Sequence, residues 1–338
     1  MKSLFRFLAF AFATAMLLVL TNCTQTKDTS VTSNSPTNNA SPAATSVVEN
    51  PTSGKDQINI NSAILSELDK LEAKLGVPAL SNKIQASRPY SNTEELVSKK
   101  VITQEQFGQI KDMVTVQDVV LTGVAKDVDY MSKLGLMKGH LLVAKELLEQ
   151  GKPDQAEPHI GHPVEEIYVD VEDQLQERQV PEFKNTLISL QDLVKSNPKD
   201  TKVSSNFDQS MQAVDRAIQV LPESQRQSPQ FVLPVINELL DAANSEYGAA
   251  IANDKIAAVI EYQDSRGFVT YVDTLLKNIS DQVTKENPEA QKAIAESMTQ
   301  LKTAWPSAQA PAKPALPPDQ VSQLIKTIEQ NAQKLVKS

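Results

Sequence analysis

Apolar side chains recur every three or four residues along most of the chain after residue 55, the spacing that places them on one face of an α-helix. Leu68, Leu71 and Leu75 show this spacing early, and residues 319–338 show it again at the end. No run of alternating β-branched residues lies between turn residues, so the pattern gives little sign of a sheet. We therefore predict an all-α protein.

The first apolar run differs from these helices. Lys2 and Arg6 are followed by about 14 mostly apolar residues, which are too few to cross a bilayer comfortably. The run ends in Leu20-Thr21-Asn22-Cys23, which resembles a bacterial lipobox, although Asn22 replaces the usual small residue. We predict a signal peptide in residues 1–22. A plain secretory signal and an uncleaved anchor remain alternatives.

Cys23 is the only cysteine among 338 residues, so the chain can form no internal disulfide. It lies where a lipid-modified cysteine must lie, and acyl chains such as palmitate would tether the protein to a membrane surface without spanning it. Residues 23–54 are rich in Thr, Ser, Asn and Pro, which predicts a disordered tether with a reach of roughly 30 Å. The sequence thus predicts a lipid-anchored, periplasm-facing envelope protein. Thr24 in place of Asp suggests the outer membrane.

The remaining chain divides by composition. Residues 55–118 hold eight Lys or Arg and nine Asp or Glu, whereas residues 119–338 carry a net charge of −9. Such an acidic charge repels phosphate backbones and keeps a protein soluble. Residues 306–318 are rich in Pro and Ala, which predicts a linker. We therefore predict a small module in residues 55–118, an antiparallel helical bundle in residues 119–305, this linker, and an amphipathic helix in residues 319–338.

The small module carries several short motifs in a fixed order. Residues 58–63 read ININSA, a break follows at Gly76-Val77-Pro78, and RPYSNTEELV follows at residues 88–97. In these motifs, residues 57–118 resemble the helix-hairpin-helix module of ComEA-type DNA-uptake proteins and of the extrinsic photosystem II protein PsbU. The first resemblance implies a DNA-binding accessory of uptake, and the second a structural subunit of a membrane complex.

DNA binding in such a hairpin depends on a Gly-x-Gly turn, whose backbone N–H groups hold a phosphate. Gly76 is followed here by a valine and a proline, and proline supplies no N–H. The second hairpin, residues 99–103, has no glycine. We therefore expect nucleic-acid binding to be weak, and a docking role for the module is favoured. The basic residues that would contact phosphates in the alternative are Lys83, Arg88, Lys99 and Lys100.

All three histidines of the chain lie within 23 residues, at His140, His159 and His162. His140 has apolar residues three and four positions away on both sides, so its side chain is expected to point into a helical core. Histidine nitrogens and carboxylate oxygens are ligands for iron, copper or zinc. The sequence therefore suggests a transition-metal site in which Glu165 and Glu166 assist the three histidines.

Helix-end effects offer an equally good explanation. If Gly161 ends a helix, His159 lies in its last turn, where a partial positive charge is favoured. Pro163 would then begin the next helix, and the two glutamates that follow would suit its positive end. His140 would be a hydrogen-bonded core histidine. The sequence leaves the two interpretations about even.

A further set of motifs lies in the predicted bundle. Residues 139–152 read GHLLVAKELLEQGK, residues 246–256 read EYGAAIANDKI, and residues 261–268 read EYQDSRGF. In these motifs, residues 120–285 resemble the helical periplasmic domain that accompanies bacterial high-affinity iron permeases.

That resemblance implies a helical bundle that handles iron. The acidic residues Glu246, Glu261 and Asp264 would face the histidine segment and complete the metal site. The alternative is an internal hydrogen-bond and salt-bridge network in which these acids pair with basic residues such as Arg266. Such networks are at least as common as metal sites.

Motifs of the common enzyme classes are absent from the sequence, which has no P-loop, dinucleotide glycine pattern, HExxH, CxxC or serine elbow. The only cysteine is assigned to the lipid, which leaves no thiol nucleophile. We therefore expect a non-enzymatic envelope lipoprotein that docks a protein partner, with a helical domain that handles a metal such as iron.

Overall fold

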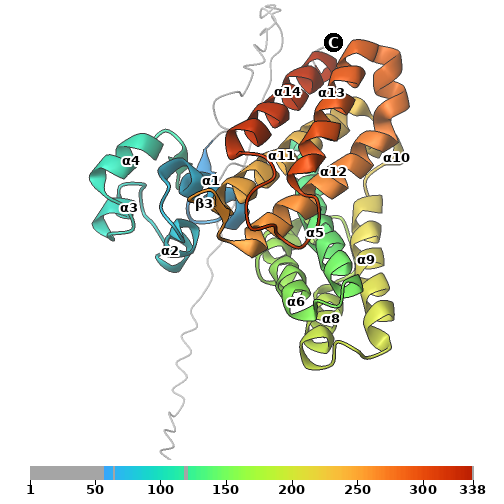
Figure 1. Ribbon diagram of the computed structural model, residues 1–338, viewed down its shortest axis with the longest axis horizontal. Coiled ribbons are helices and arrows are strands. Elements are labelled where there is room, and N and C mark those ends of the chain that lie inside the picture. The colour runs from blue at the N-terminus through green and yellow to red at the C-terminus, as the bar shows by residue number, and fades with distance from the viewer. Residues whose placement is uncertain (1–56, 64, 118–120, 337–338) are drawn as a thin grey trace, which may run out of the picture. The chain divides into compact units, whose positions relative to one another are not determined.

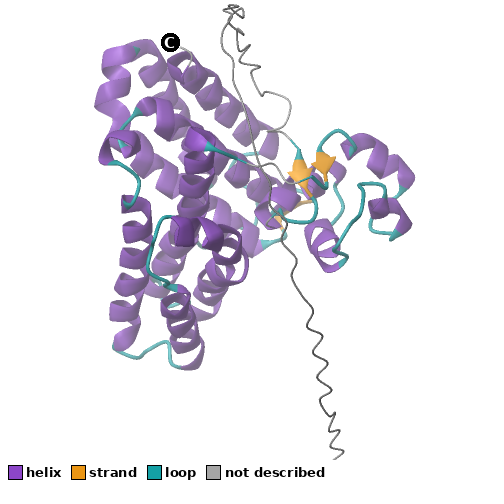
Figure 2. Ribbon diagram, turned by 180° about the vertical axis from the view of Figure 1, so that it is seen from behind, coloured by secondary structure: helices purple, strands orange, loops and turns teal. Residues whose placement is uncertain are grey.

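The computed structural model describes residues 57–63, 65–117 and 121–336. As the hydrophobic pattern predicts, the fold is all-α: helices make up most of the described chain, and its strands form two short ladders (Figure 2). Cys23, the predicted signal peptide and the tether lie outside the described residues. Within the described ranges, we find no helix with both the length and the apolar character needed to cross a bilayer.

The small module has its own hydrophobic core. Strand β1 (Ile58–Asn59) pairs in parallel with β2 (Val114–Thr115), which brings the two ends of the module together. Between the strands lie α1 (Leu65–Leu75), α2 (Leu80–Ala86), α3 (Glu95–Ser98) and α4 (Gln104–Ile110). Their buried side chains include Ile60, Leu68, Leu71, Leu80, Ile84, Leu96, Phe107 and Ile110.

Local sequence signals account for the ends of two of these helices. Gly76 adopts a φ of 61°, a left-handed conformation that costs glycine little, and it follows the last residue of α1. Thr103 caps α4: its hydroxyl accepts a hydrogen bond from the Gln106 N–H, and the Gln106 side chain accepts one from the Thr103 N–H. This reciprocal cap explains why α4 starts at the next residue.

The rest of the described chain is a helical bundle. Its two longest helices, α5 (Gly123–Glu149) and α12 (Val259–Glu286), pack against each other. Between them the chain forms α6 (Pro153–His162), a π-helical turn η1 (Pro163–Ile167), α7 (Tyr168–Glu177), α8 (Lys184–Ser196), α9 (Lys202–Gln219), α10 (Glu223–Arg226), α11 (Pro229–Ala249), β3 (Ile251–Ala252) and β4 (Lys255–Ile256). After α12 come α13 (Pro288–Leu301), a 3-10 turn η2 (Lys302–Ala304) and α14 (Pro318–Val336).

Helices α11 to α14 pack as one group, and α5, α6, α8 and α9 pack as another (Figure 1). α5 joins the groups through its contacts with α11 and α12. Residues 306–318, predicted as a linker, connect α13 to α14 as a packed segment, because Ala308 is buried and the Tyr247 hydroxyl donates to the Leu316 carbonyl at 2.7 Å.

Two glycines set the distance between α5 and α12. A Cβ added at Gly267 would lie 2.2 Å from the Gly139 carbonyl oxygen, and one added at Gly139 would lie 2.5 Å from Phe268 Cδ1. The two backbones therefore meet at a distance that side chains would prevent. Because His140 follows Gly139, and Asp264 precedes Gly267 by three residues, this contact brings His140 and Asp264 together.

The histidine segment is a continuous helical run. The sequence suggested a helix stop at Gly161, but α6 runs through this residue to His162 and continues through η1 into α7. Pro163 lacks an N–H and its ring crowds the preceding turn, so the helix widens here, and the Tyr168 N–H donates to the Pro163 carbonyl five residues back. The predicted stop is therefore wrong.

Candidate metal centre

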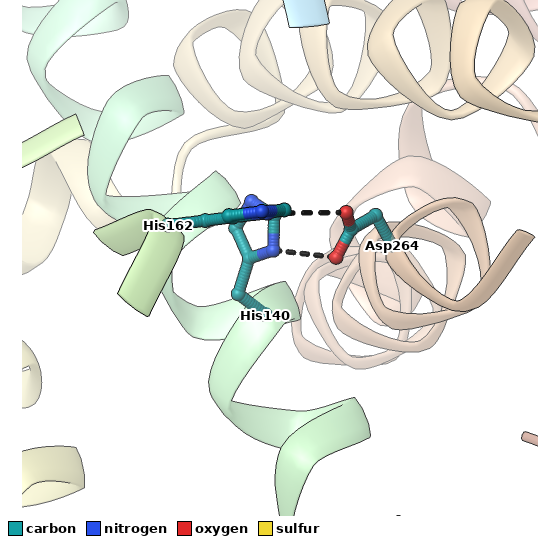
Figure 3. A group of neighbouring side chains, drawn as sticks. All are labelled: His140, His162 and Asp264. Carbon is teal, nitrogen blue, oxygen red and sulfur yellow. Dashed lines mark ion pairs between the residues drawn. The ribbon is translucent and has the colours of Figure 1, made fainter. Parts of the chain in front are cut away.

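Three histidines from two helices surround one aspartate. His140 lies on α5, His159 and His162 lie on α6, and Asp264 lies on α12. The Asp264 carboxylate is 2.6 Å from the His140 Nδ1 and 2.6 Å from the His159 Nδ1. It is 3.4 Å from the His162 Nδ1. Figure 3 shows the rings of His140 and His162 beside the same carboxylate. The structure thus gathers all three histidines of the chain.

His159 is fully buried, and both of its ring nitrogens face oxygen acceptors. Nδ1 contacts Asp264, and Nε2 lies 2.9 Å from Gln263 Oε1. The Gln263 amide is fixed in this orientation because its Nε2 donates to the Ala308 carbonyl. Both ring nitrogens are therefore engaged by oxygen atoms of the protein, and neither is open to a metal ion. We therefore interpret His159 as the residue that orients Asp264 rather than as a ligand.

His140 offers a nitrogen that hydrogen bonding leaves unused. Its side chain is 6 % exposed, and Nδ1 makes no hydrogen bond, although an Asp264 carboxylate oxygen lies 2.6 Å away. The Phe268 ring meets the His140 ring edge-on, with 5.0 Å between the centroids. One donor atom each from His140, His162 and Asp264 lie within 4.8 Å of one another. The unpartnered nitrogen thus faces two other metal-ligating groups.

Burial and charge give the two candidate histidines different protonation states. Burial lowers the pKa of His140 and outweighs the attraction of Asp264, so the ring is neutral near pH 7. Burial also disfavours charge on His162, but the hydrogen bond and charge of Asp264 outweigh it and raise the pKa of His162 to about 9. Burial works against ionised Asp264 as well, yet the contacts with His140 and His159 hold its pKa well below the usual range. A metal ion here must replace the proton of His162.

The candidate ligands open into a pocket of about 690 Å³. Residues of α1, α5, α6, η1, α11, β3 and α12 line it. Its ionisable lining residues are two histidines and six carboxylates, and no Lys or Arg is among the described residues that line it. Such a lining attracts cations and repels anions. The carboxylates are Asp69, Glu72, Glu166, Glu246, Glu261 and Asp264.

The other carboxylates predicted for the metal site differ in whether they line the pocket. Glu166, Glu246 and Glu261 line the pocket, whereas Glu165 is exposed and is not part of the lining. Burial raises the pKa of Glu166 to about 7, against the opposing charge of His162. The glutamates that line the pocket therefore remain candidates for a fourth ligand, whereas Glu165 is not placed for that role.

Arg266 does not serve as the partner of these acids. Its Nε and Nη2 contact the two carboxylate oxygens of Glu146, at 2.8 and 3.0 Å, and its Nη1 donates to the Trp305 carbonyl. The internal network considered as an alternative therefore does not run through Arg266.

Asp69 and Glu72 line the pocket but were not among the residues predicted from the sequence. Both lie on α1 of the small module, and α1 packs against α11 of the bundle. Their spacing of three residues puts them on one helix face, which is the only signal the sequence holds. Acidic pairs at this spacing are common on solvated helices, so the pattern alone does not mark a site.

Three of the four basic residues considered for DNA contact donate to backbone carbonyls of the module. Arg88 donates to two carbonyls between β1 and α1. Lys99 donates to two carbonyls that precede Tyr90, and its ammonium lies 4.7 Å from the centre of the Tyr90 ring. Lys83 and Lys100 are exposed, and the Lys83 ammonium donates to the Pro78 carbonyl at 3.4 Å. Three of the four predicted phosphate contacts thus make hydrogen bonds within the module.

The backbone N–H groups of the first hairpin bind a carboxylate of the same module. The N–H groups of Ala79 and Ser81, at the start of α2, donate to the Glu72 carboxylate at 2.9 and 3.3 Å. A side-chain carboxylate therefore takes the N–H groups that a DNA-binding hairpin would offer to a phosphate.

We therefore expect weak, salt-sensitive DNA binding, with a Kd no tighter than about 10⁻⁶ M at physiological salt, as for non-specific binders. A gel-shift titration of the full-length chain with duplex DNA, repeated between about 50 and 200 mM salt, measures this. Submicromolar affinity at physiological salt would contradict the expectation and favour a role in DNA uptake.

Residues 222–338 match the family model of the iron permease-associated 4-helix bundle domain. The similarity covers the C-terminal third of the chain. It includes α11 to α14 and therefore Asp264 with Glu246 and Glu261, whereas the three histidines precede it. The match supports the predicted resemblance in residues 222–285 and extends it to the last helix. No curated protein and no solved structure matches the chain.

Proposed function

We propose that the protein binds a transition-metal ion, with iron as the first candidate, between α5, α6 and α12. One observation carries the proposal: donor atoms of His140, His162 and Asp264 lie within 4.8 Å of one another, and the buried His140 Nδ1 has no hydrogen-bond partner. Among the described residues that line the pocket there is no Lys or Arg, which supports the proposal, because no permanently charged side chain there competes with a metal cation for the carboxylates.

The donor set suits this class of ion. Two imidazole nitrogens and one carboxylate oxygen, with further positions open, form the ligand set of many ferrous sites, and zinc and copper accept the same donors. Metal–ligand bonds of about 2.1 Å place neighbouring ligand atoms roughly 3 to 3.5 Å apart. The His140 and His162 Nδ1 atoms lie 2.6 and 3.4 Å from the Asp264 carboxylate oxygens. Small side-chain movements would therefore bring the three groups to the separations found around a bound metal ion. Glu166 or water fills a remaining position.

The metal is handled rather than used in catalysis. The C-terminal similarity to an iron permease-associated domain supports a membrane iron permease as the protein partner. A soluble domain that holds iron beside such a permease would deliver the ion or take it up. The histidines come from helices outside the matched region, so we propose that this chain adds α5 and α6 to the shared bundle to complete the site.

A lipid at Cys23 would keep the domain at the membrane where its partner lies. This part of the proposal rests on the lipobox-like Leu20-Thr21-Asn22-Cys23 and the predicted tether that follows. Cys23→Ser should move the protein from the membrane fraction to the soluble fraction. Unchanged membrane partition, together with a wild-type mass that shows no acyl chain, would exclude the lipid anchor.

Titration of the full-length, metal-free chain with ferrous, cupric or zinc ions tests the metal site. We expect one ion at the histidine–aspartate centre, with micromolar or tighter affinity. The melting temperature should rise with ion concentration, because the ion binds the folded form. His140→Ala and His162→Ala should each weaken binding by at least about tenfold.

Glu165→Gln is the matched control, because Glu165 is close in sequence but exposed and outside the pocket lining. It should bind the metal as the wild type does. If none of the three ions binds better than millimolar, or if both histidine variants bind as the wild type does, the histidines are structural and the protein is a docking scaffold.

A further inference from the structure

Gln263 lies on α12 and connects the metal centre to the chain that follows α13. The residue is 1 % exposed, and it is not among the described residues that line the pocket. Its Oε1 lies 2.9 Å from His159 Nε2, and its Nε2 donates to the Ala308 carbonyl at 3.0 Å and to Gln155 Oε1 at 2.9 Å. Gln263 can therefore influence a bound metal ion only through another residue.

Residues 305–309 hold the Gln263 amide in place, because other side chains of α12 bind the same segment. The Trp305 indole N–H donates to Ser265 Oγ at 2.7 Å. The Tyr262 hydroxyl donates to a backbone carbonyl of the segment at 3.0 Å. All three of these residues are buried. Buried hydrogen bonds of this kind are costly to leave unmade, so the segment stays against α12.

The Ala308 carbonyl decides which way round the Gln263 amide lies. A carbonyl oxygen only accepts hydrogen bonds, so the amide NH₂ group faces Ala308 and the amide oxygen faces His159. His159 Nε2 must then carry the hydrogen of this bond. Nδ1 is the nitrogen that remains for Asp264, whose carboxylate oxygen lies 2.6 Å away. The amide thus fixes the orientation of the His159 ring relative to Asp264.

We infer that Gln263 is a positioning residue for the metal centre, which acts through His159 to hold the Asp264 carboxylate toward the candidate histidine ligands. The inference rests on the proposed metal site. Hydrogen-bond partners behind a ligand fix its orientation, and losing one typically weakens metal binding roughly 10- to 100-fold. Because residues 305–309 hold Gln263, part of the segment predicted as a linker supports the site.

Nitrogen-15 labelling of histidine tests the hydrogen-bond arrangement in the metal-free, full-length chain. Long-range proton–nitrogen spectra distinguish a ring nitrogen that carries hydrogen from one that does not, and His140→Ala and His162→Ala assign the signals. We expect His159 Nε2 to carry hydrogen in the wild type. It should lose this hydrogen in Gln263→Met, which has a similar size but no amide, while Nδ1 keeps its contact with Asp264. A wild-type His159 without hydrogen on Nε2 overturns the inference.

Zinc titration of the same proteins tests the effect on the site. Gln263→Met should weaken zinc binding by at least about tenfold. Gln263→Glu should stay within about threefold of the wild type, because a carboxyl group has the same shape and keeps an oxygen for His159. A role in packing alone predicts the opposite order, because methionine fills the buried space with an apolar side chain and glutamate buries a polar carboxyl group.

A double variant shows whether Gln263 acts through His159. In a His159→Ala background, Gln263→Met should change zinc affinity by less than about twofold, because the residue through which it acts is gone. Gln309→Met is the matched control: Gln309 belongs to the same segment, but it is exposed and donates to Gln150. It should bind zinc as the wild type does.

The outcomes separate this inference from the proposed function. If the wild type does not bind zinc, the metal site itself fails. If the wild type binds zinc and Gln263→Met binds it equally well, or if the loss persists in the His159→Ala background, only the positioning role fails. Melting without metal checks folding. Gln263→Asn, whose amide is one methylene shorter, is the second variant and should weaken zinc binding in the same direction.

Discussion

Replacing Gly267 by alanine should lower the free energy of unfolding by about 3 kcal/mol and weaken metal binding at least tenfold. The added Cβ would lie 2.2 Å from the Gly139 carbonyl oxygen, and the nearest atoms are backbone atoms that cannot rotate away. α5 and α12 must therefore separate. Because His140 and Asp264 lie beside this contact, their 2.6 Å approach must lengthen as well. Thermal or denaturant unfolding and a zinc titration measure the two effects.

Gly108→Ala provides the matched control. Gly108 is also helical, in α4, but a Cβ added there would meet nothing within 4 Å. The change should leave metal binding unaltered and stabilise the protein slightly, by up to about 1 kcal/mol, because alanine favours helix more than glycine does. If Gly267→Ala has the same melting temperature as the wild type, α5 and α12 do not meet as closely as the structure shows. The positioning of Asp264 would then need another cause.

The apparent affinity for zinc or ferrous ion should rise about 100-fold from pH 6 to pH 8. The pKa of His162 is raised to about 9, so one proton must leave when the metal binds, and each pH unit below 9 costs about tenfold. A histidine with the unshifted pKa of about 6.5 would give only about a fourfold rise over the same range. Chelator competition at fixed ionic strength measures the slope, and calorimetry in two buffers counts the released proton.

Two variants identify the group responsible. His162→Gln should bind the metal more weakly and with little dependence on pH. Glu166→Gln should keep the steep slope, although Glu166 has a pKa raised to about 7 by burial and titrates in the same window. If the slope disappears in Glu166→Gln and persists in His162→Gln, the glutamate rather than the histidine controls binding.

The same pKa shift acts in the opposite direction on the stability of the metal-free protein. The folded state holds the His162 proton more tightly than the unfolded state, in which the pKa is about 6.5. The resulting stabilisation is fully present below pH 6.5 and is lost as the pH rises through about 9. Without metal, the melting temperature should therefore fall between pH 7 and pH 9, while metal affinity rises.

The all-α fold follows from the sequence, because apolar spacing is a local property of the chain. The stripe on α1 and the cap at Thr103 need no distant residue to define them. The helix stop expected at Gly161 failed for a tertiary reason. The local signals of Gly161 and Pro163 favour the end of a helix. The chain stays helical through both residues because α6 packs against α5 and α8.

For the site, the sequence by itself determined which residues are chemically able to ligate: three clustered histidines and several acids. Only the tertiary structure decided their roles. His159 has both nitrogens engaged by Asp264 and Gln263, whereas His140 has a nitrogen without a hydrogen-bond partner, and no local pattern distinguishes the two. Asp69 joins the pocket from a separate module because α1 packs on α11. Such distinctions depend on distances and angles between residues far apart in sequence, and these are fixed only when the helices pack.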